Sequence, residues 1–284
     1  MTDAPALADL GPVLLVGAGR MGGALLDGWL AGGLPASRVT AVAPGTATHQ
    51  ALAARGVTAA ARPEDLAADL APAVVVLAVK PQMMETVLPA YARFVQPGTV
   101  FLSVAAGRTL DALGGLLGAE AAILRGMPNT PAAVGRGMTV LCANARVTAD
   151  QRRQGQALLA AVGETAWVAD EALMDAATGV SGSGPAYVFH MIEALARAGA
   201  EAGLPPDLAA RLARATVIGA GELARQSEAD AETLRRNVTS PGGTTEAALR
   251  ELMGSADPVD TGGGLTALMT RSVRAAAARS RELA

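Results

Sequence analysis

The chain has 284 residues, of which 51% are hydrophobic and 17% are charged, with a formal net charge of −3, and this length predicts two domains or one large one. Its single cysteine, Cys142, excludes an internal disulfide, and two histidines leave too few ligands for a zinc site, so no metal is expected. The acidic net charge and the scarcity of aromatic residues (two Trp, two Tyr and three Phe) argue against nucleic-acid binding.

The apolar bias, with a mean hydropathy of +0.32, does not predict a membrane protein. The longest stretch without Asp, Glu, Lys or Arg, Ala176–Ile192, is interrupted by Gly, Ser, Thr, Pro and His, whereas a spanning helix needs about 20 predominantly apolar residues. The first residues contain Asp3 and Asp9 and lack a basic region, so no signal peptide is predicted. We therefore expect a cytoplasmic protein.

Strand and helix patterns alternate through the first half of the chain. The predicted strands are Val13–Val16, Arg38–Ala43, Val57–Ala60, Ala73–Val79, Thr99–Val104, Ala121–Leu124, Met138–Cys142 and Glu164–Val168. The predicted helices are Met21–Ala31, Ala47–Arg55, Pro63–Ala68, Gln82–Phe94, Leu110–Leu117 and one that runs from a capping box at Thr148 to Val162. This alternation predicts an α/β Rossmann domain with a doubly wound, mostly parallel sheet.

After about Ala169 the pattern becomes almost purely helical. The predicted helices there are Glu171–Thr178, Ala186–Ala202, Pro206–Gln226, Ala231–Arg236, Thr245–Met253 and Val259–Glu282. The change from alternating elements to helices alone divides the chain into a Rossmann domain, residues 1–166, and an all-α domain, residues 167–284.

A glycine-rich turn, Gly17-Ala18-Gly19-Arg20-Met21-Gly22, follows the first predicted strand. In such a motif the first glycine permits a tight turn, the second lets the backbone approach a pyrophosphate, and the third allows close packing of helix and strand. The helix that follows offers unpaired N–H groups and the positive end of its dipole to phosphates. The motif predicts a dinucleotide site, and its alternative interpretation is a purely structural turn.

The end of the second predicted strand bears on the choice of cofactor. NAD sites usually place Asp or Glu there, where it binds the ribose 2′-hydroxyl. This chain has Ala43 instead, and no acid follows as far as His49. Because His49 and Arg62 offer positive charge to a 2′-phosphate, we expect NADP as cofactor, with NADPH preferred over NADH. The alternative is that Arg62 is an ordinary surface residue.

Three further segments follow predicted strands, and ligands of doubly wound sheets bind beyond the carboxyl ends of the strands. The segments are Ala78-Val79-Lys80-Pro81, Ser103-Val104-Ala105-Ala106-Gly107 and Met127-Pro128-Asn129-Thr130-Pro131. Small residues in the second segment leave room for a nicotinamide ring. The cofactor-binding residues predicted here are Val79, Lys80, Pro81, Ala105, Ala106, Gly107 and Asn129. Lys80 has the alternative of simply extending into solvent.

Two Ser- and Gly-rich segments interrupt the helical half, at Val180–Tyr187 and at Asn237–Thr245. Each places backbone N–H groups, hydroxyls and a helix N-terminus together, which is the arrangement that binds anions. Either segment alone would be interpreted as a capped connection between helices. Together, beside a dinucleotide motif, they predict a site for a small carboxylate.

These motifs, in this order and spacing, are similar to those of pyrroline-5-carboxylate reductases, from Pro12 to Leu283. The most specific segment is Val238–Thr245, because the glycine motif is shared with many dehydrogenases. The resemblance implies reduction of the cyclic imine 1-pyrroline-5-carboxylate to L-proline with NADPH or NADH, the last step of proline biosynthesis. It also implies that the helical domain serves dimerisation by interleaving with that of a second copy, and that such dimers often assemble into a decamer.

Carried over residue by residue, the resemblance implies that Ser240 and the backbone amides of Gly243, Thr244 and Thr245 hold the substrate carboxylate, with Gly242 in the same turn. It places the Thr245 hydroxyl near the ring nitrogen and Lys80 at the active-site region, and these two residues are the catalytic candidates. Ser181 and Gly182 are expected to line the substrate site. Ala43 departs from the family, which often has a hydroxyl or a basic residue there, and this leaves the 2′-phosphate contact open.

Three alternatives compete with this interpretation. A 3-hydroxyacid dehydrogenase would need a lysine on a helix of the second domain, and the helical half contains none. A reductase of a related cyclic imine carboxylate differs only by about one methylene in the pocket. A non-catalytic NADP-binding module would bind the cofactor without consuming it.

Overall fold

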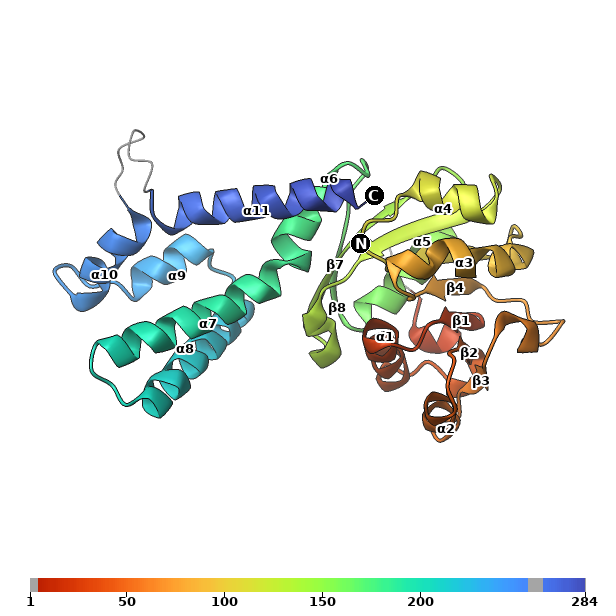
Figure 1. The fold of residues 1–284 in the computed structure, drawn as a ribbon, viewed down its shortest axis with the longest axis horizontal. Helices are drawn as coiled ribbons and strands as arrows, with labels where there is room; N and C mark the ends of the chain where they lie inside the picture. Colours follow the sequence, from red (N-terminus) through yellow and green to blue (C-terminus); the bar gives the residue numbers. More distant parts are fainter. Residues whose placement is uncertain (1–4, 255–262, 284) are drawn as a thin grey trace. The chain divides into compact units, whose positions relative to one another are not determined.

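The computed structural model describes residues 5–254 and 263–283. The chain forms two compact units, one of residues up to Gly182 together with those from Ala276 on, and one of Ser183–Ala275. The first unit contains the sheet and the second contains helices only, as Figure 1 shows. Both halves of the predicted fold class are thereby confirmed.

A single mixed sheet forms the centre of the first unit, in the order β3-β2-β1-β4-β5-β6-β7-β8. Neighbouring strands run parallel except for β6 and β7, which pair antiparallel. The strands are β1 (Val13–Val16), β2 (Val39–Val42), β3 (Thr58–Ala60), β4 (Val74–Leu77), β5 (Val100–Ser103), β6 (Ala122–Met127), β7 (Gly137–Ala143) and β8 (Gly163–Trp167). Every predicted strand is present. Only β6 runs clearly beyond its prediction, because Arg125 and Gly126 interrupt the apolar pattern that marks the strand in the sequence.

The α-helices of this unit are α1 (Arg20–Ala31), α2 (Thr46–Ala53), α3 (Met84–Val87), α4 (Leu110–Leu117), α5 (Ala149–Ala160) and α6 (Leu173–Ala177). The capping box at Thr148 is confirmed, because its hydroxyl accepts from the Gln151 N–H and the Gln151 side chain bonds back. The predicted helix Gln82–Phe94 is wrong in part: only α3 is α-helical, between 3₁₀ segments. Pro89 lacks an N–H donor and its ring clashes with the preceding turn, which explains the break. The predicted helix Pro63–Ala68 is only a 3₁₀ turn, Pro63–Asp65.

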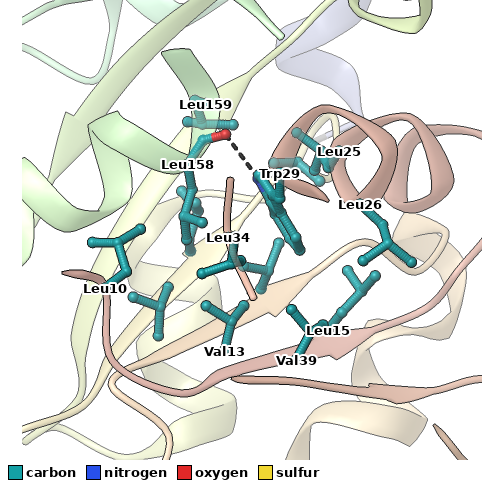
Figure 2. Packing of buried hydrophobic residues seen from close by; sticks show 14 of the residues in the cluster. Leu10, Val13, Leu15, Leu25, Leu26, Trp29, Leu34, Val39, Leu158 and Leu159 are labelled. Atoms are coloured by element: carbon teal, nitrogen blue, oxygen red, sulfur yellow. Dashed lines mark hydrogen bonds between the residues drawn. The ribbon is translucent and has the colours of Figure 1, made fainter. Parts of the chain in front are cut away.

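Apolar side chains bury both faces of the sheet. On β1, Leu14 belongs to one core cluster and Leu15 to the other, because successive strand residues point to opposite faces. Helices α1 and α5 cover one face, where the indole Nε1 of Trp29 donates to the Leu158 carbonyl at 2.8 Å (Figure 2). Residues of α3 and α4 cover the other face. Burial on two faces explains the unbroken apolar runs of the central strands.

A third, smaller apolar cluster joins α6 to the sheet of the first unit. Cys142 and Val140 of β7 pack against Met174 of α6, so this short helix belongs with the sheet. The packing division therefore falls after Gly182, whereas the change to purely helical structure falls at the end of β8. The domain border at residues 166–167 stays a prediction. Cys142 is 1% exposed, and burial raises the pKa of its thiol to about 11, which fits a packing role.

The second unit is built from α7 (Gly184–Glu201), α8 (Pro206–Gln226), α9 (Ala231–Asn237), α10 (Thr244–Met253) and most of α11 (Gly264–Glu282). Helices α7 and α8 lie side by side (Figure 1), with Ala209 and Ala213 buried. The predicted helices of this half are confirmed, except that Val259, the predicted start of the last one, lies outside the described residues. No helix in the described ranges is long and apolar enough to cross a membrane.

Candidate functional site

The cofactor candidates of the first unit gather at one edge of the sheet. The register aligns the last residue of β1, Val16, with Val42 and Leu77, and aligns Leu77 with Ser103. Because these strands are parallel, the segments that follow them meet beyond the same edge. The structure thus brings the glycine motif together with Ala43, with Ala78–Pro81 and with Ser103–Gly107.

Each glycine of the motif meets a different demand. Gly17 has a φ of +96°, a conformation that favours glycine, and its N–H donates to the Val42 carbonyl at 2.9 Å. A Cβ added at Gly22 would lie 2.0 Å from the Gly17 carbonyl oxygen, so that helix α1 could not approach the turn. A Cβ at Gly19 would meet nothing within 4 Å. Gly19 therefore faces open space at the site where the motif predicts a pyrophosphate.

The start of α1 supplies the electrostatic half of the same site. Gly19 is the N-cap residue and no side chain caps the helix. The first helical residues, Arg20 and Met21, are exposed and half-buried, respectively. A helix N-terminus has N–H groups without partners in the helix, and the positive end of its dipole favours anions. The residues present fit a dinucleotide.

The loop after β4 contains the only lysine of the chain. Lys80 is exposed and begins the 3₁₀ turn at Pro81, and its ammonium has no hydrogen bond or ion pair within the described ranges. Val79 beside it is half-buried. In the loop after β5, Ala105 and Gly107 are buried while Ala106 is exposed. A group bound at this edge would meet a small apolar surface beside the Lys80 ammonium.

Asn129 and Ser181, predicted for different ligands, are direct partners. The Asn129 amide Nδ2 donates to the Ser181 carbonyl at 3.1 Å and to its hydroxyl at 3.3 Å. Its Oδ1 accepts from the Met138 N–H at 2.9 Å. Ser181 and Gly182 end a π-helical turn, Thr178–Gly182, a type of turn that is frequent at functional sites. Asn129 thus fixes this turn to the sheet, an interaction between residues far apart in the sequence.

The region beyond β2 contains an acid that the sequence reasoning missed. Arg62 is exposed and pairs with Asp65 at 3.2 Å, and this hydrogen bond raises the pKa of Arg62. The Ala43 N–H donates to the Ala60 carbonyl at 3.1 Å, which brings the Arg62 turn beside the end of β2. His49 donates from Nε2 to the Ala43 carbonyl at 2.6 Å. The Arg62 guanidinium and the His49 imidazole therefore lie near Ala43, the first paired with Asp65 and the second bonded to the Ala43 carbonyl.

The candidate substrate segment joins α9 to α10 in the second unit. Gly242 has a φ of +70°, and its N–H donates to Glu246 Oε2 at 2.5 Å. The Gly243 N–H donates to the Ser240 carbonyl at 3.0 Å. Both amides are thus used within the turn. No side chain caps α10, whose first residues are Thr244 and Thr245, so their N–H groups stand at a helix N-terminus.

Glu246 shapes this turn and was not foreseen. Its carboxylate accepts from Gly242 and from the Arg250 guanidinium, at 3.0 Å in the latter case. These two donors, the Gly242 N–H first, lower the pKa of Glu246 below its usual value. An acid three residues into a helix often bonds back to the preceding turn. That rule could have identified Glu246 from the sequence.

Comparisons with known proteins cover nearly the whole chain. Residues 171–283 match the family described as pyrroline-5-carboxylate reductase dimerisation, and residues 12–107 match the family described as NADP oxidoreductase coenzyme F420-dependent. The chain is 42% identical over 273 residues to a pyrroline-5-carboxylate reductase of Pseudomonas aeruginosa, covering 96% of each, and 38% identical to that of Pisum sativum, covering 98% of each.

The chain is also similar to solved structures of pyrroline carboxylate reductases. A pyrroline-5-carboxylate reductase of Coxiella burnetii matches with a TM-score of 0.88 at 32% identity, over 97% of this chain and 99% of that one. The Plasmodium falciparum pyrroline carboxylate reductase, solved with NADP bound, matches with a TM-score of 0.78 at 27% identity, over 97% and 98% of the two chains.

Proposed function

This chain belongs to the pyrroline-5-carboxylate reductase family, and we propose from that membership how its residues share the work of the reaction. It reduces 1-pyrroline-5-carboxylate to L-proline with NADP as cofactor, the final step of proline biosynthesis. The observation that carries the assignment of the substrate site is the uncapped N-terminus of α10 behind the Ser240–Gly243 turn.

The glycine motif holds the cofactor pyrophosphate, with Gly17, Gly19 and Gly22 allowing its close approach to α1. Val79, Lys80 and Pro81 line the next loop, and the exposed Ala106, between the buried Ala105 and Gly107, offers a small surface to the nicotinamide. When bound, the reduced nicotinamide supplies the hydride that the imine carbon accepts. Orienting the two reactants and excluding water are the protein's main tasks in such chemistry.

The substrate carboxylate binds at the start of α10. The N–H groups of Thr244 and Thr245 and the Ser240 hydroxyl surround the site, and the helix dipole favours a negative charge there. Because the Gly243 N–H already donates to the Ser240 carbonyl, it shapes the turn and is not free to donate to the substrate carboxylate. The protonated ring nitrogen is a cation, so the neutral Thr245 hydroxyl can accept its hydrogen bond without the repulsion that an ammonium would cause.

Replacing Thr245 with alanine should lower kcat/KM for the imine by roughly 10–100-fold, the effect of losing an active-site hydrogen bond of about 1.4–3 kcal/mol. Thr245→Ser keeps the hydroxyl and should retain most of the activity. Steady-state kinetics at saturating NADPH measure both variants. Kinetics of Thr245→Ala that match the unmodified enzyme would remove Thr245 from the mechanism.

NADPH is preferred over NADH because Arg62 and His49 flank Ala43 where an acid would favour NADH. Arg62→Met should raise the KM for NADPH by roughly 5–10-fold, the value of about one charge-assisted hydrogen bond at an exposed site. The KM for NADH, which lacks the 2′-phosphate, should change less than twofold and serves as the internal control. A clear preference of the unmodified enzyme for NADH would contradict this assignment.

The chain forms homo-oligomers through its helical unit, with the homodimer as the basic assembly and a homodecamer as a further one. Large apolar side chains of α7 and α8 are exposed, among them Phe189 at 60% and Ile218 at 59%. Exposed apolar surface of this kind marks a protein interface. Light scattering should give a multiple of the 28.4 kDa subunit mass and distinguishes the two assemblies.

The single buried cysteine is consistent with a cytoplasmic location.

A spectrophotometric assay tests the overall proposal. Reduced cofactor should be consumed only when 1-pyrroline-5-carboxylate is present, and L-proline should form in equal amount. Faster turnover of the six-membered imine carboxylate would identify a related reductase instead. Cofactor binding without turnover of either imine would indicate a binding module.

A further inference from the structure

Arg108 links two of the loops at the cofactor edge. It directly follows Gly107, at the end of the loop after β5. Its Nε and Nη2 donate to the Pro81 carbonyl at 3.2 and 2.9 Å, and its Nη1 pairs with Glu85 Oε1 at 3.1 Å. The side chain is 18% exposed; its two bonds to Pro81 are partly buried, whereas the pair with Glu85, whose side chain is 69% exposed, lies at the surface. A planar guanidinium can hold one carbonyl with two N–H groups, whereas a lysine cannot.

Backbone hydrogen bonds between these two loops end where the sheet ends. The β4–β5 ladder ends at Leu77 and Ser103, and the bond from the Val104 N–H to the Leu77 carbonyl, at 3.1 Å, is the last backbone bond between the loops in the described part of the chain. Beyond it the loops run on to Pro81 and Gly107 with no backbone bond between them in the described ranges. The bond from Arg108 to Pro81 closes them again at their far ends.

The other sides of both loops are tightly packed. A Cβ at Gly17 would lie 2.9 Å from the Ala78 carbonyl oxygen, so the pyrophosphate turn rests against the loop after β4. Gly107 has a φ of +68°, and a Cβ there would lie 2.9 Å from the Leu283 carbonyl oxygen. The glycine turn thus contacts the loop after β4, and the loop after β5 contacts the end of α11. The bonds from Arg108 to Pro81 connect these two loops to each other.

We propose that Arg108 is a positioning residue for the nicotinamide half of the cofactor. This inference rests on the proposed cofactor site. Arg108 acts through Pro81: it fixes the spacing between Val79–Pro81 and Ala105–Gly107, the two surfaces between which the ring is held. Loss of these bonds lets the loops move apart, and the ordering that they now supply must then be provided by cofactor binding.

The test compares NADPH binding in Arg108→Met, Arg108→Lys and two control variants. Arg38→Met is the matched control, because Arg38 also donates to two backbone carbonyls, of Ala8 and Leu10, at 2.9 and 2.6 Å, but precedes β2 at the opposite edge of the sheet. Glu85→Gln weakens the ion pair and leaves both bonds to Pro81. The dissociation constant for NADPH is measured by calorimetry, and kcat and both KM values by steady-state kinetics.

Arg108→Met should raise the Kd and the KM for NADPH about 10-fold, with kcat and the KM for the imine changed less than threefold. Arg108→Lys should lie between this variant and the unmodified enzyme, and Arg38→Met and Glu85→Gln should bind NADPH normally. Arg108→Met or Arg108→Lys binding NADPH as the unmodified enzyme does would overturn the proposal, and so would an equal loss of affinity in Arg38→Met. Turnover of the imine by the unmodified enzyme tests the proposed function separately. The ratio of the NADPH Kd values of variant and unmodified enzyme does not depend on that turnover.

Discussion

Replacing Gly22 with alanine should raise the dissociation constant for NADPH by more than about 100-fold, or about 2.7 kcal/mol. The new Cβ would lie 2.0 Å from the Gly17 carbonyl oxygen. Both atoms belong to backbone or are bonded directly to it, so no side chain can move aside. Helix α1 must shift away from β1, and its N-terminus then leaves the position at which it meets the phosphates.

Two neighbouring glycines provide matched controls. Gly23→Ala would meet nothing within 4 Å, so normal binding and a slightly more stable helix are expected. Gly19→Ala is equally free of contacts, but its Cβ would face the phosphates, so it should fold normally and bind NADPH weakly. Calorimetric titration and thermal unfolding separate the three outcomes. Tight binding by Gly22→Ala would mean that the turn does not hold the pyrophosphate.

Glu171→Ala should lower the free energy of unfolding by about 3–4 kcal/mol, because it leaves a buried charge without its partner. Arg125 of β6 is 3% exposed, and its Nη1 pairs with Glu171 Oε1 at 2.7 Å. The same carboxylate oxygen accepts from the Leu110 N–H at 2.9 Å, at the start of α4. The substitution therefore removes, at once, the acceptor of the buried Arg125 and that of the half-buried Leu110 N–H.

Urea unfolding measures this loss against a surface pair. Glu120→Ala removes the partner of Arg146, an exposed pair at 2.8 Å, and should cost less than about 1 kcal/mol. A double variant, Arg125→Met with Glu171→Leu, should recover most of the stability because no unpaired charge remains. Equal stability of Glu171→Ala and Glu120→Ala would show that the buried pair contributes no more than a surface one.

The sequence was sufficient wherever a local pattern fixes the structure. A short, β-branched apolar run such as Val74–Leu77 indicates a strand buried on two faces, and the glycine motif sets its own turn and helix start. The capping box at Thr148 is likewise a property of four consecutive residues. The edge at which we propose the cofactor site followed from these elements, because parallel strands place their carboxyl ends together.

Interactions between distant residues could not be predicted in this way. Asn129 meets Ser181, and Arg108 meets Pro81, only because the sheet folds their segments together. The charge of Arg62 was evident, but its pairing with Asp65 depends on the side-chain conformation in a short turn. The helix predicted over Gln82–Phe94 failed at Pro89, a residue whose effect on a helix is known and was outweighed by the apolar periodicity.

The sheet unit is discontinuous in sequence, and this affects the order in which the protein can fold during synthesis. Ser280 at the end of α11 donates to Asp175 Oδ1 at 2.7 Å, and Leu283 packs against Gly107. Strands β1–β8 can pair as soon as they leave the ribosome. The loop after β5, however, lacks its contact with Leu283 until the end of α11 has also emerged. We expect a nascent chain arrested after α10 to have a folded sheet but an incomplete version of the proposed nicotinamide site.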